Sequence, residues 1–163
     1  MPTVTSDEYR DLIGRFASGV TVVTTLCEGI PYGTTASSLT SVSLTPPLLL
    51  VCMNRSSATG RAIASSGHFA VNVLAEDQAE LSHHFARQGS TFDDHPFRPG
   101  DRGAPVLPDA LASFECRVTD EVVAGTHVVI VGEVERAGGR AGLPLAYFRG
   151  RFGRLSVSNI STD

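Results

Sequence analysis

Long apolar runs and paired cysteines are both missing from this chain of 163 residues. No stretch of about 18 apolar residues occurs, so the sequence argues against a membrane partner. The three cysteines lie far apart without a CxxC pair, which argues against a zinc site: Cys27, Cys52 and Cys116. The first residues lack the basic and apolar regions of a secretion signal, so we expect a cytoplasmic protein with reduced thiols.

Basic clusters and common nucleotide motifs are absent as well. The formal net charge is -4, and this acidic balance argues against a nucleic-acid partner. Neither GxGxxG nor the P-loop motif occurs. His83 and His84 are adjacent on a predicted helix and point about 100° apart, so they lack the spacing of paired metal ligands. We therefore expect no metal site.

The apolar patterns predict one mainly β domain over residues 1–163, with a core at about 9–156. Seven or eight strands are expected, and Leu48–Met53 among them is predicted to be buried on both faces. Because strands and helices do not alternate, the patterns favour an antiparallel barrel with peripheral helices over a doubly wound sheet. Residues 89–109 are rich in Gly, Pro and Asp and are predicted to form a long surface loop.

Two or three helices are expected, over residues 6–19, 57–67 and 77–89. Ser6 and Ser57 are the expected N-caps of the first two, and Asp77 with Glu80 resembles a capping box. The first helix is predicted to be amphipathic because apolar side chains recur at helical spacing: Tyr9, Leu12, Ile13 and Phe16.

Two clusters of small polar residues are candidates for a binding site. The first, residues 33–43, reads GTTASSLTSVS, and the second, residues 54–59, reads NRSSAT and leads into a helix. Hydroxyl groups at such places can simply satisfy backbone groups near strand ends. Small side chains also let a flat ligand approach the backbone, and a helix N-terminus beside an arginine suits a phosphate. Both interpretations stay open from composition alone.

The order of several longer motifs resembles the short-chain flavin reductase family over about residues 9–156. These motifs are FASGVTVVTT, the stretch from GTTASS to NRSSAT, SGHFAVNVL, HHFA, FECRV, GTHVVIVGEV and LAYFRGRFGRL. The resemblance implies a homodimeric, antiparallel split β-barrel of the FMN-binding type. It also implies hydride transfer from NADH or NADPH to N5 of FMN or FAD, and supply of the reduced flavin to a partner monooxygenase.

Carried over by position, the resemblance assigns most small polar residues to the flavin. The polar ring edge would meet Thr35, Ala36, Ser37 and Ser38, with Ser43 either close to this wall or a plain strand residue. The ribityl chain and phosphate would meet Asn54, Ser56, Ser57 and Thr59, with Arg55 adding charge. On the third expected helix the flavin would be bordered by His84, Phe85 and Ala86, whereas His83 is expected to be solvated.

The nicotinamide side is assigned in the same way. His127 would lie by the nicotinamide, although the family commonly has Gly-Asp-His where this chain has Gly125-Thr126-His127. The NAD(P)H side would be completed by Tyr147, Arg149 and Gly150. Phe152 stands where a tyrosine is frequent, which removes one hydroxyl contact.

Two other functions are weighed against the reductase. One is a flavin store or carrier without hydride transfer, and the other is an enzyme with tightly held FMN, as in pyridoxamine-phosphate oxidase relatives of this barrel. A store needs no nicotinamide site, so His127 and the YFRG segment favour the reductase. The extra basic residues of the oxidase relatives are not evident. The apolar strand Val128–Val131 would suit the buried interface of a homodimer.

Overall fold

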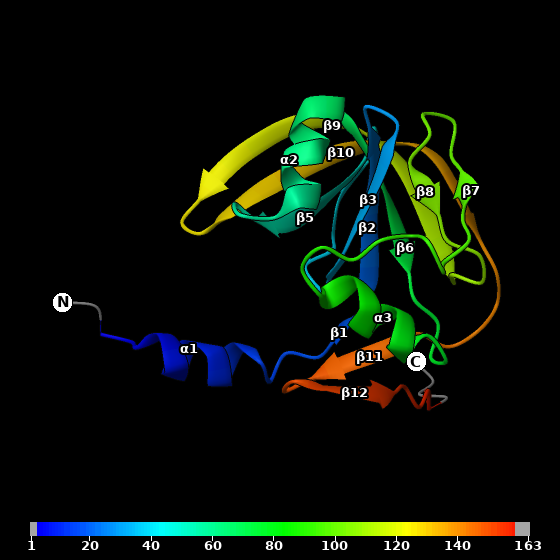
Figure 1. Ribbon diagram of the computed structural model, residues 1–163. Coiled ribbons are helices and arrows are strands. Elements are labelled where there is room, and N and C mark those ends of the chain that lie inside the picture. The colour runs from blue at the N-terminus through cyan, green and yellow to red at the C-terminus, as the bar shows by residue number, and fades with distance from the viewer. Residues whose placement is uncertain (1–2, 159–163) are drawn as a thin grey trace.

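The computed structural model describes residues 3–158, which form three helices and twelve strands (Figure 1). The helices are α1 (Ser6–Ile13), α2 (Ala58–Ser66) and α3 (Ala79–Ala86). The strands are β1 (Ser18–Gly19), β2 (Thr21–Cys27), β3 (Ile30–Ala36), β4 (Thr40–Leu44), β5 (Pro47–Asn54), β6 (His68–Val73), β7 (Arg98–Pro99), β8 (Pro105–Val106), β9 (Ala112–Ala124), β10 (His127–Gly139), β11 (Leu145–Phe148) and β12 (Arg151–Arg154).

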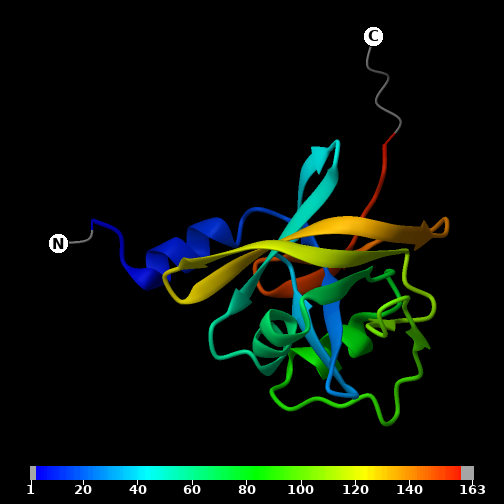
Figure 2. The same ribbon diagram turned by 90° about the horizontal axis from the view of Figure 1, so that it is seen from above.

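The main sheet has seven antiparallel strands in the order β3-β2-β6-β9-β10-β5-β4. Its long central strands β9 and β10 cross the molecule side by side in Figure 2. Just after β3, the Ser38 hydroxyl accepts from the Cys52 amide at 2.9 Å and donates to the Cys52 carbonyl at 3.1 Å. Because Cys52 lies on β5, these bonds link the chain after β3, at one edge of the sheet, to a strand next to the opposite edge. The predicted antiparallel, mainly β architecture is confirmed.

A second sheet of three strands, β1-β11-β12, closes one side of the molecule. Figure 1 shows it beside α3, below the main sheet. Ser18 of β1 pairs with Tyr147 of β11, so the first strand of the chain meets one of the last. The C-terminal turn of β11 and β12 is thereby held next to β3 and α3.

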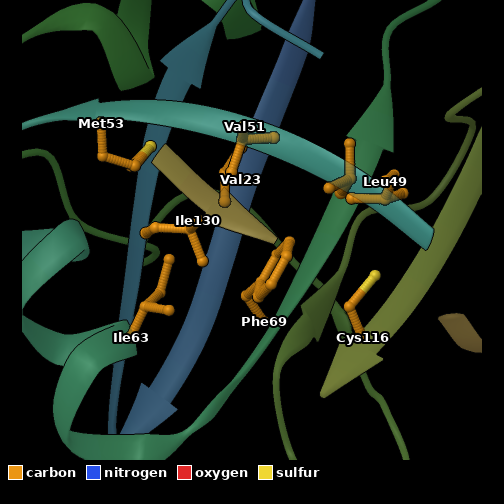
Figure 3. Packing of buried hydrophobic residues seen from close by; sticks show 9 residues of the cluster. Val23, Leu49, Val51, Met53, Ile63, Phe69, Cys116 and Ile130 are labelled. Atoms are coloured by element: carbon orange, nitrogen blue, oxygen red, sulfur yellow. The ribbon is translucent and has the colours of Figure 1, made fainter. Parts of the chain in front are cut away.

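The main core lies on one face of the curved sheet, where α2 covers it (Figure 3). Val23, Val51 and Phe69 from three strands are fully buried there, and Ile63 of α2 packs against them. Burying each such side chain stabilises the fold by about 1.5–3 kcal/mol. The expectation that β5 is buried on both faces is wrong. Every second residue from Leu49 to Met53 is buried, while the residues between them are only half-buried, because one face of the strand points away from the core.

Residues 89–109 do not form the predicted surface loop. They contain the short strands β7 and β8, and Phe92 and Leu107 are buried in a second core cluster with Phe85. The buried amide of Asn72 on β6 also holds this segment, because its Oδ1 accepts from the Leu107 amide at 2.8 Å. The apolar side chains of the segment therefore outweigh its Gly, Pro and Asp content.

The helix ends differ from several sequence predictions. Thr5, rather than Ser6, caps α1 and forms a capping box with Glu8, and the helix ends at Gly14 because the chain then turns into β1. For α2 the predicted cap Ser57 and the end at Gly67 are confirmed. For α3 the capping box is wrong: the helix follows Gln78 without a side-chain cap and ends at Arg87.

Candidate functional site

Two neighbouring hollows meet at the C-terminal end of α3. The first, here the α3 hollow, encloses about 550 Å³ and is walled by Thr35–Ser37, by Ser82, His83 and Ala86, and by the β11–β12 turn. The second, the α2 hollow, encloses about 700 Å³ between β3, the start of α2 and residues 86–93. Ala86 lines both. The structure thus brings the two predicted small-residue clusters to adjoining hollows.

The hydroxyls of the first cluster are mostly used by the protein itself. Thr35 Oγ1 donates to the Ser82 carbonyl at 2.7 Å, which ties β3 to α3. Ser38 is bonded to both backbone groups of Cys52, as described above. The first interpretation therefore holds for these two hydroxyls, because both form hydrogen bonds with backbone groups of the protein. They also fix the small wall of the α3 hollow, in which Ala36 leaves room for a ligand.

The α2 hollow contains a helix N-terminus built by short polar side chains. Asn54 Oδ1 accepts from the Ser56 amide at 2.9 Å, and the Ser57 hydroxyl accepts from the Gly60 amide at 3.2 Å. The first amides of a helix lack partners within the helix and favour an anion. Thr59 of the same turn is buried and lines the hollow.

The arginine of this hollow is not the predicted one. The backbone amide of Arg55 donates to the Thr126 carbonyl at 3.0 Å, and Arg55 does not line either hollow. Arg87, just after α3, lines the α2 hollow instead. Sequence reasoning missed Arg87 because its proximity to α2 depends on how α3 packs against β3. A helix N-terminus with a nearby guanidinium fits a phosphate.

On α3 the two histidines lie on different sides of the helix, and His83 is exposed, as expected. His83 lines the α3 hollow and meets Phe152 edge-on, with ring centroids 4.8 Å apart. His84 lies on the other side, where its Nε2 is 2.7 Å from the Thr91 carbonyl. Phe85 is fully buried in the second core cluster and cannot border a ligand with its ring. Of the three residues predicted to border the flavin here, only Ala86 lines the hollows.

The turn between β11 and β12 supplies the other wall of the α3 hollow. Tyr147 and Gly150, which the resemblance assigns to the NAD(P)H side, line it, whereas Arg149 points to α1, where its Nη2 lies 3.1 Å from Asp11 Oδ1. The pKa of Asp11 is lowered, first by its hydrogen bond to Arg15 and to a lesser extent by Arg149. Arg151, which sequence reasoning did not select, lines the α3 hollow instead.

His127 and Ser43 lie outside both hollows. His127 begins β10 opposite Asn54, and its Nδ1 is 2.9 Å from the Thr126 hydroxyl. The hydrogen-bond partner of His127 Nδ1 is thus a hydroxyl and not a carboxylate. The Ser43 hydroxyl accepts from the Thr45 amide at 3.2 Å, so the structure favours the plain strand interpretation.

Within residues 3–158, no group of three or more His, Cys, Asp or Glu side chains is placed to hold a metal ion. None of the helices α1, α2 and α3 combines the length and hydropathy needed to cross a membrane.

The residues present fit a flavin mononucleotide moiety. The α3 hollow has a wall of small side chains that includes Ser82, whose buried Oγ has no hydrogen-bond partner within residues 3–158, and the adjoining α2 hollow has phosphate-binding features. A planar ring needs close access to backbone groups, and a phosphate needs amides and positive charge. The fold and site together define a split-barrel protein of the flavin-binding class.

The chain belongs to the family described as flavin reductase like domain, which matches residues 13–156. The reductase component of 4-nitrophenol 4-monooxygenase/4-nitrocatechol 2-monooxygenase from Rhodococcus opacus is 48% identical over 149 residues, covering 91% of this chain and 80% of that protein. The FMN reductase (NADH) SmoA of Agrobacterium fabrum is 46% identical over 151 residues, covering 93% of this chain and 87% of that protein.

Solved structures agree with this family. The NADH:FAD oxidoreductase SgcE6 of Streptomyces globisporus, in complex with NAD and FAD fragments, has a TM-score of 0.90 and 33% sequence identity, covering 98% of this chain and 100% of that chain. The predicted family and split-barrel fold are therefore confirmed. The protein is an oxidoreductase of the flavin reductase type, with flavin and a nicotinamide cofactor as its reactants. The alternative function, a flavin store or carrier without hydride transfer, is not supported.

Proposed function

We propose that this protein oxidises NADH, reduces FMN or FAD, and passes the reduced flavin to the oxygenase component of a two-component monooxygenase. The observation that carries the proposal is the pair of hollows joined at Ala86, one suited to a flat ring and one to a phosphate. The names of the relatives from Rhodococcus opacus and Agrobacterium fabrum support it. Because NADH is a reductant of the cytoplasm, we place the reaction there.

The chain's own residues hold and orient the reactants. When both are bound, the nicotinamide would supply a hydride and the flavin would accept it at N5. The backbone of Thr35–Ser37 presents its polar groups to the ring edge, where negative charge grows during reduction. Arg151 lines the same hollow and its positive charge favours that negative charge, and His83 lies on the same wall. The start of α2 and Arg87 hold the phosphate.

The preference for NADH follows from the hollow next to the β11–β12 turn. This hollow, of about 660 Å³, shares Tyr147 and Gly150 with the α3 hollow and is bordered by α1. Its arginines are already paired, Arg10 with Asp7 and Arg149 with Asp11, both at 3.1 Å. A 2′-phosphate would have to compete with these carboxylates for the arginines, so we expect NADPH to react more slowly than NADH.

The function is tested by mixing purified protein with NADH and free FMN and following the nicotinamide absorbance. We expect flavin-dependent loss of NADH, slower loss of NADPH, and turnover of an added oxygenase component without further reductase. FAD replaces FMN in a parallel series. If neither NADH nor NADPH is consumed with either flavin, the proposal is refuted.

We also propose that the protein is a homodimer. No residue of α1 is buried, and its apolar face is exposed: Tyr9 is 62% exposed, Leu12 56% and Ile13 52%. The helix projects from the body of the chain in Figures 1 and 2. A second copy is the expected cover for such a face. Of Val128–Val131, Ile130 is buried in the main core and serves the chain's own packing.

Light scattering during gel filtration tests the dimer. Leu12→Glu places a charge on the exposed face and should produce a folded monomer. Leu143→Glu, at a half-exposed apolar side chain away from α1, is the matched control and should leave the dimer intact. A wild-type chain that elutes as a monomer would refute this part of the proposal.

A further inference from the structure

The hydroxyl of Ser82 lacks the partner that a buried polar group normally has. Ser82 lies in the middle of α3 and is fully buried, yet its Oγ has no hydrogen-bond partner among residues 3–158. More than about 90% of buried polar groups in proteins are hydrogen-bonded. Ser82 also forms part of the wall of the α3 hollow. The missing partner is therefore expected to come from that side.

Several other hydroxyls around this hollow are already bonded. Thr35 Oγ1 donates to the Ser82 carbonyl, and Thr21 Oγ1 donates to the Ala36 carbonyl, both at 2.7 Å. Ser38 is bonded to Cys52. Three hydroxyls on the wall of the α3 hollow have no hydrogen-bond partner within residues 3–158: those of the exposed Ser37 and Tyr147, and that of the buried Ser82. Of the residues expected from the motif to contact the ring edge, Thr35 and Ser38 have bonded hydroxyls, whereas the Ser37 hydroxyl is free.

We propose that Ser82 is a positioning residue for the flavin, and that its hydroxyl hydrogen-bonds a polar atom at the edge of the isoalloxazine ring. This rests on the proposed function. A turn about the Cα–Cβ bond directs Oγ to either side of the helix at low cost, and a hydroxyl can both donate and accept. The Thr35 bond holds the Ser82 backbone against β3, so the hydroxyl is presented from a fixed support.

Replacing Ser82 should affect the stability of the ligand-free protein and the affinity for flavin in different ways. A hydroxyl without a partner does not stabilise the ligand-free fold, so Ser82→Ala should leave the unfolding temperature unchanged or raise it. The loaded protein loses one hydrogen bond, which weakens flavin binding about three- to tenfold. A purely structural serine would show the opposite pattern.

The experiment measures the unfolding temperature of the ligand-free protein and the dissociation constants of FMN and riboflavin. The dissociation constants are obtained from the quenching of flavin fluorescence. Ser66→Ala is the matched control, because Ser66 Oγ is 2.9 Å from Thr25 Oγ1 and 3.1 Å from the His68 carbonyl, away from the hollows. It should lower the unfolding temperature and leave affinity unchanged. Ser82→Cys, a weaker donor of similar shape, should fall between wild type and Ser82→Ala.

The two probes locate the contact. If Ser82 meets the ring, Ser82→Ala weakens FMN and riboflavin by the same factor, whereas Ser57→Ala at the phosphate side weakens FMN alone. Equal affinities of Ser82→Ala and wild type would overturn the inference, as would a loss confined to FMN or a lower unfolding temperature without a change in affinity. A wild-type protein that binds neither flavin and oxidises no NADH would instead refute the proposed function, and this inference with it.

Discussion

Asn72 is the side chain whose replacement should test the fold most directly. It lies on β6, is fully buried, and bonds three backbone groups of other segments. Its Oδ1 accepts from the Leu107 amide at 2.8 Å, and its Nδ2 donates to the Val22 carbonyl at 3.1 Å and to the Pro105 carbonyl at 3.4 Å. The amide therefore joins residues 105–107 to the main sheet.

The cost of Asn72→Ala follows from these contacts. The Leu107 amide would be left buried without its acceptor, which costs about 1–3 kcal/mol. The Pro105 carbonyl keeps the Thr24 hydroxyl at 2.6 Å, so little is lost there. The small cavity left by the missing amide adds about 1 kcal/mol. We expect the free energy of unfolding to fall by about 2–4 kcal/mol, a large part of a typical total of about 5–15 kcal/mol.

Urea unfolding measures this loss, and hydrogen exchange of the Leu107 amide locates it. Asn72→Asp is the matched variant, because its carboxylate keeps the acceptor but faces the Val22 and Pro105 carbonyls. Burial raises the pKa of such a carboxyl, so the deficit relative to wild type should be small below the unfolded value of about 3.9 and grow as the pH rises. A loss under about 1 kcal/mol for Asn72→Ala, with Leu107 still protected, would refute the reasoning.

Three further predictions concern the core and the site. Gly132→Ala should cost about 1–3 kcal/mol in urea unfolding, because a Cβ there would lie 2.6 Å from Phe69 Cζ and 2.9 Å from Cys116 Cβ; an unchanged midpoint would contradict this packing. Burial, aided by the negative charges of Glu135 and Glu115, raises the pKa of the Cys116 thiol to about 12. The free energy of unfolding should therefore fall as the pH rises from about 9 toward 12, and Cys116→Ala should remove that part of the fall. A slope that survives the substitution would assign it to other groups. Ala36→Leu should fill the α3 hollow and abolish flavin binding in a fluorescence titration while the protein stays folded, and normal affinity would exclude the proposed ring position.

Local patterns explain why much of the fold was predictable from the sequence. The β2–β3 hairpin follows from a β-branched run and a turn, and α2 from the Ser57 cap and Gly67. The order of the motifs identified the family, and with it the class of reaction. The hairpin and the helix depend on residues close together in the chain, whose preferences act before any long-range contact forms.

The chemistry of individual site residues depended on distant partners. Thr35 and Ser82 are 47 positions apart, and only the packing of α3 on β3 shows that Thr35 uses its hydroxyl on the Ser82 backbone. The same packing places His83 in the hollow and His84 outside it, and the contact of α1 with the β11–β12 turn occupies Arg149.

The sequence by itself therefore determined the family, the antiparallel sheet and the two clusters that meet at the site. Tertiary structure alone decided which hydroxyls and arginines there are free to bind a ligand. The physical reason is that a polar group is available only if no nearer partner satisfies it, and for these groups the nearest partners come from segments far away in the chain.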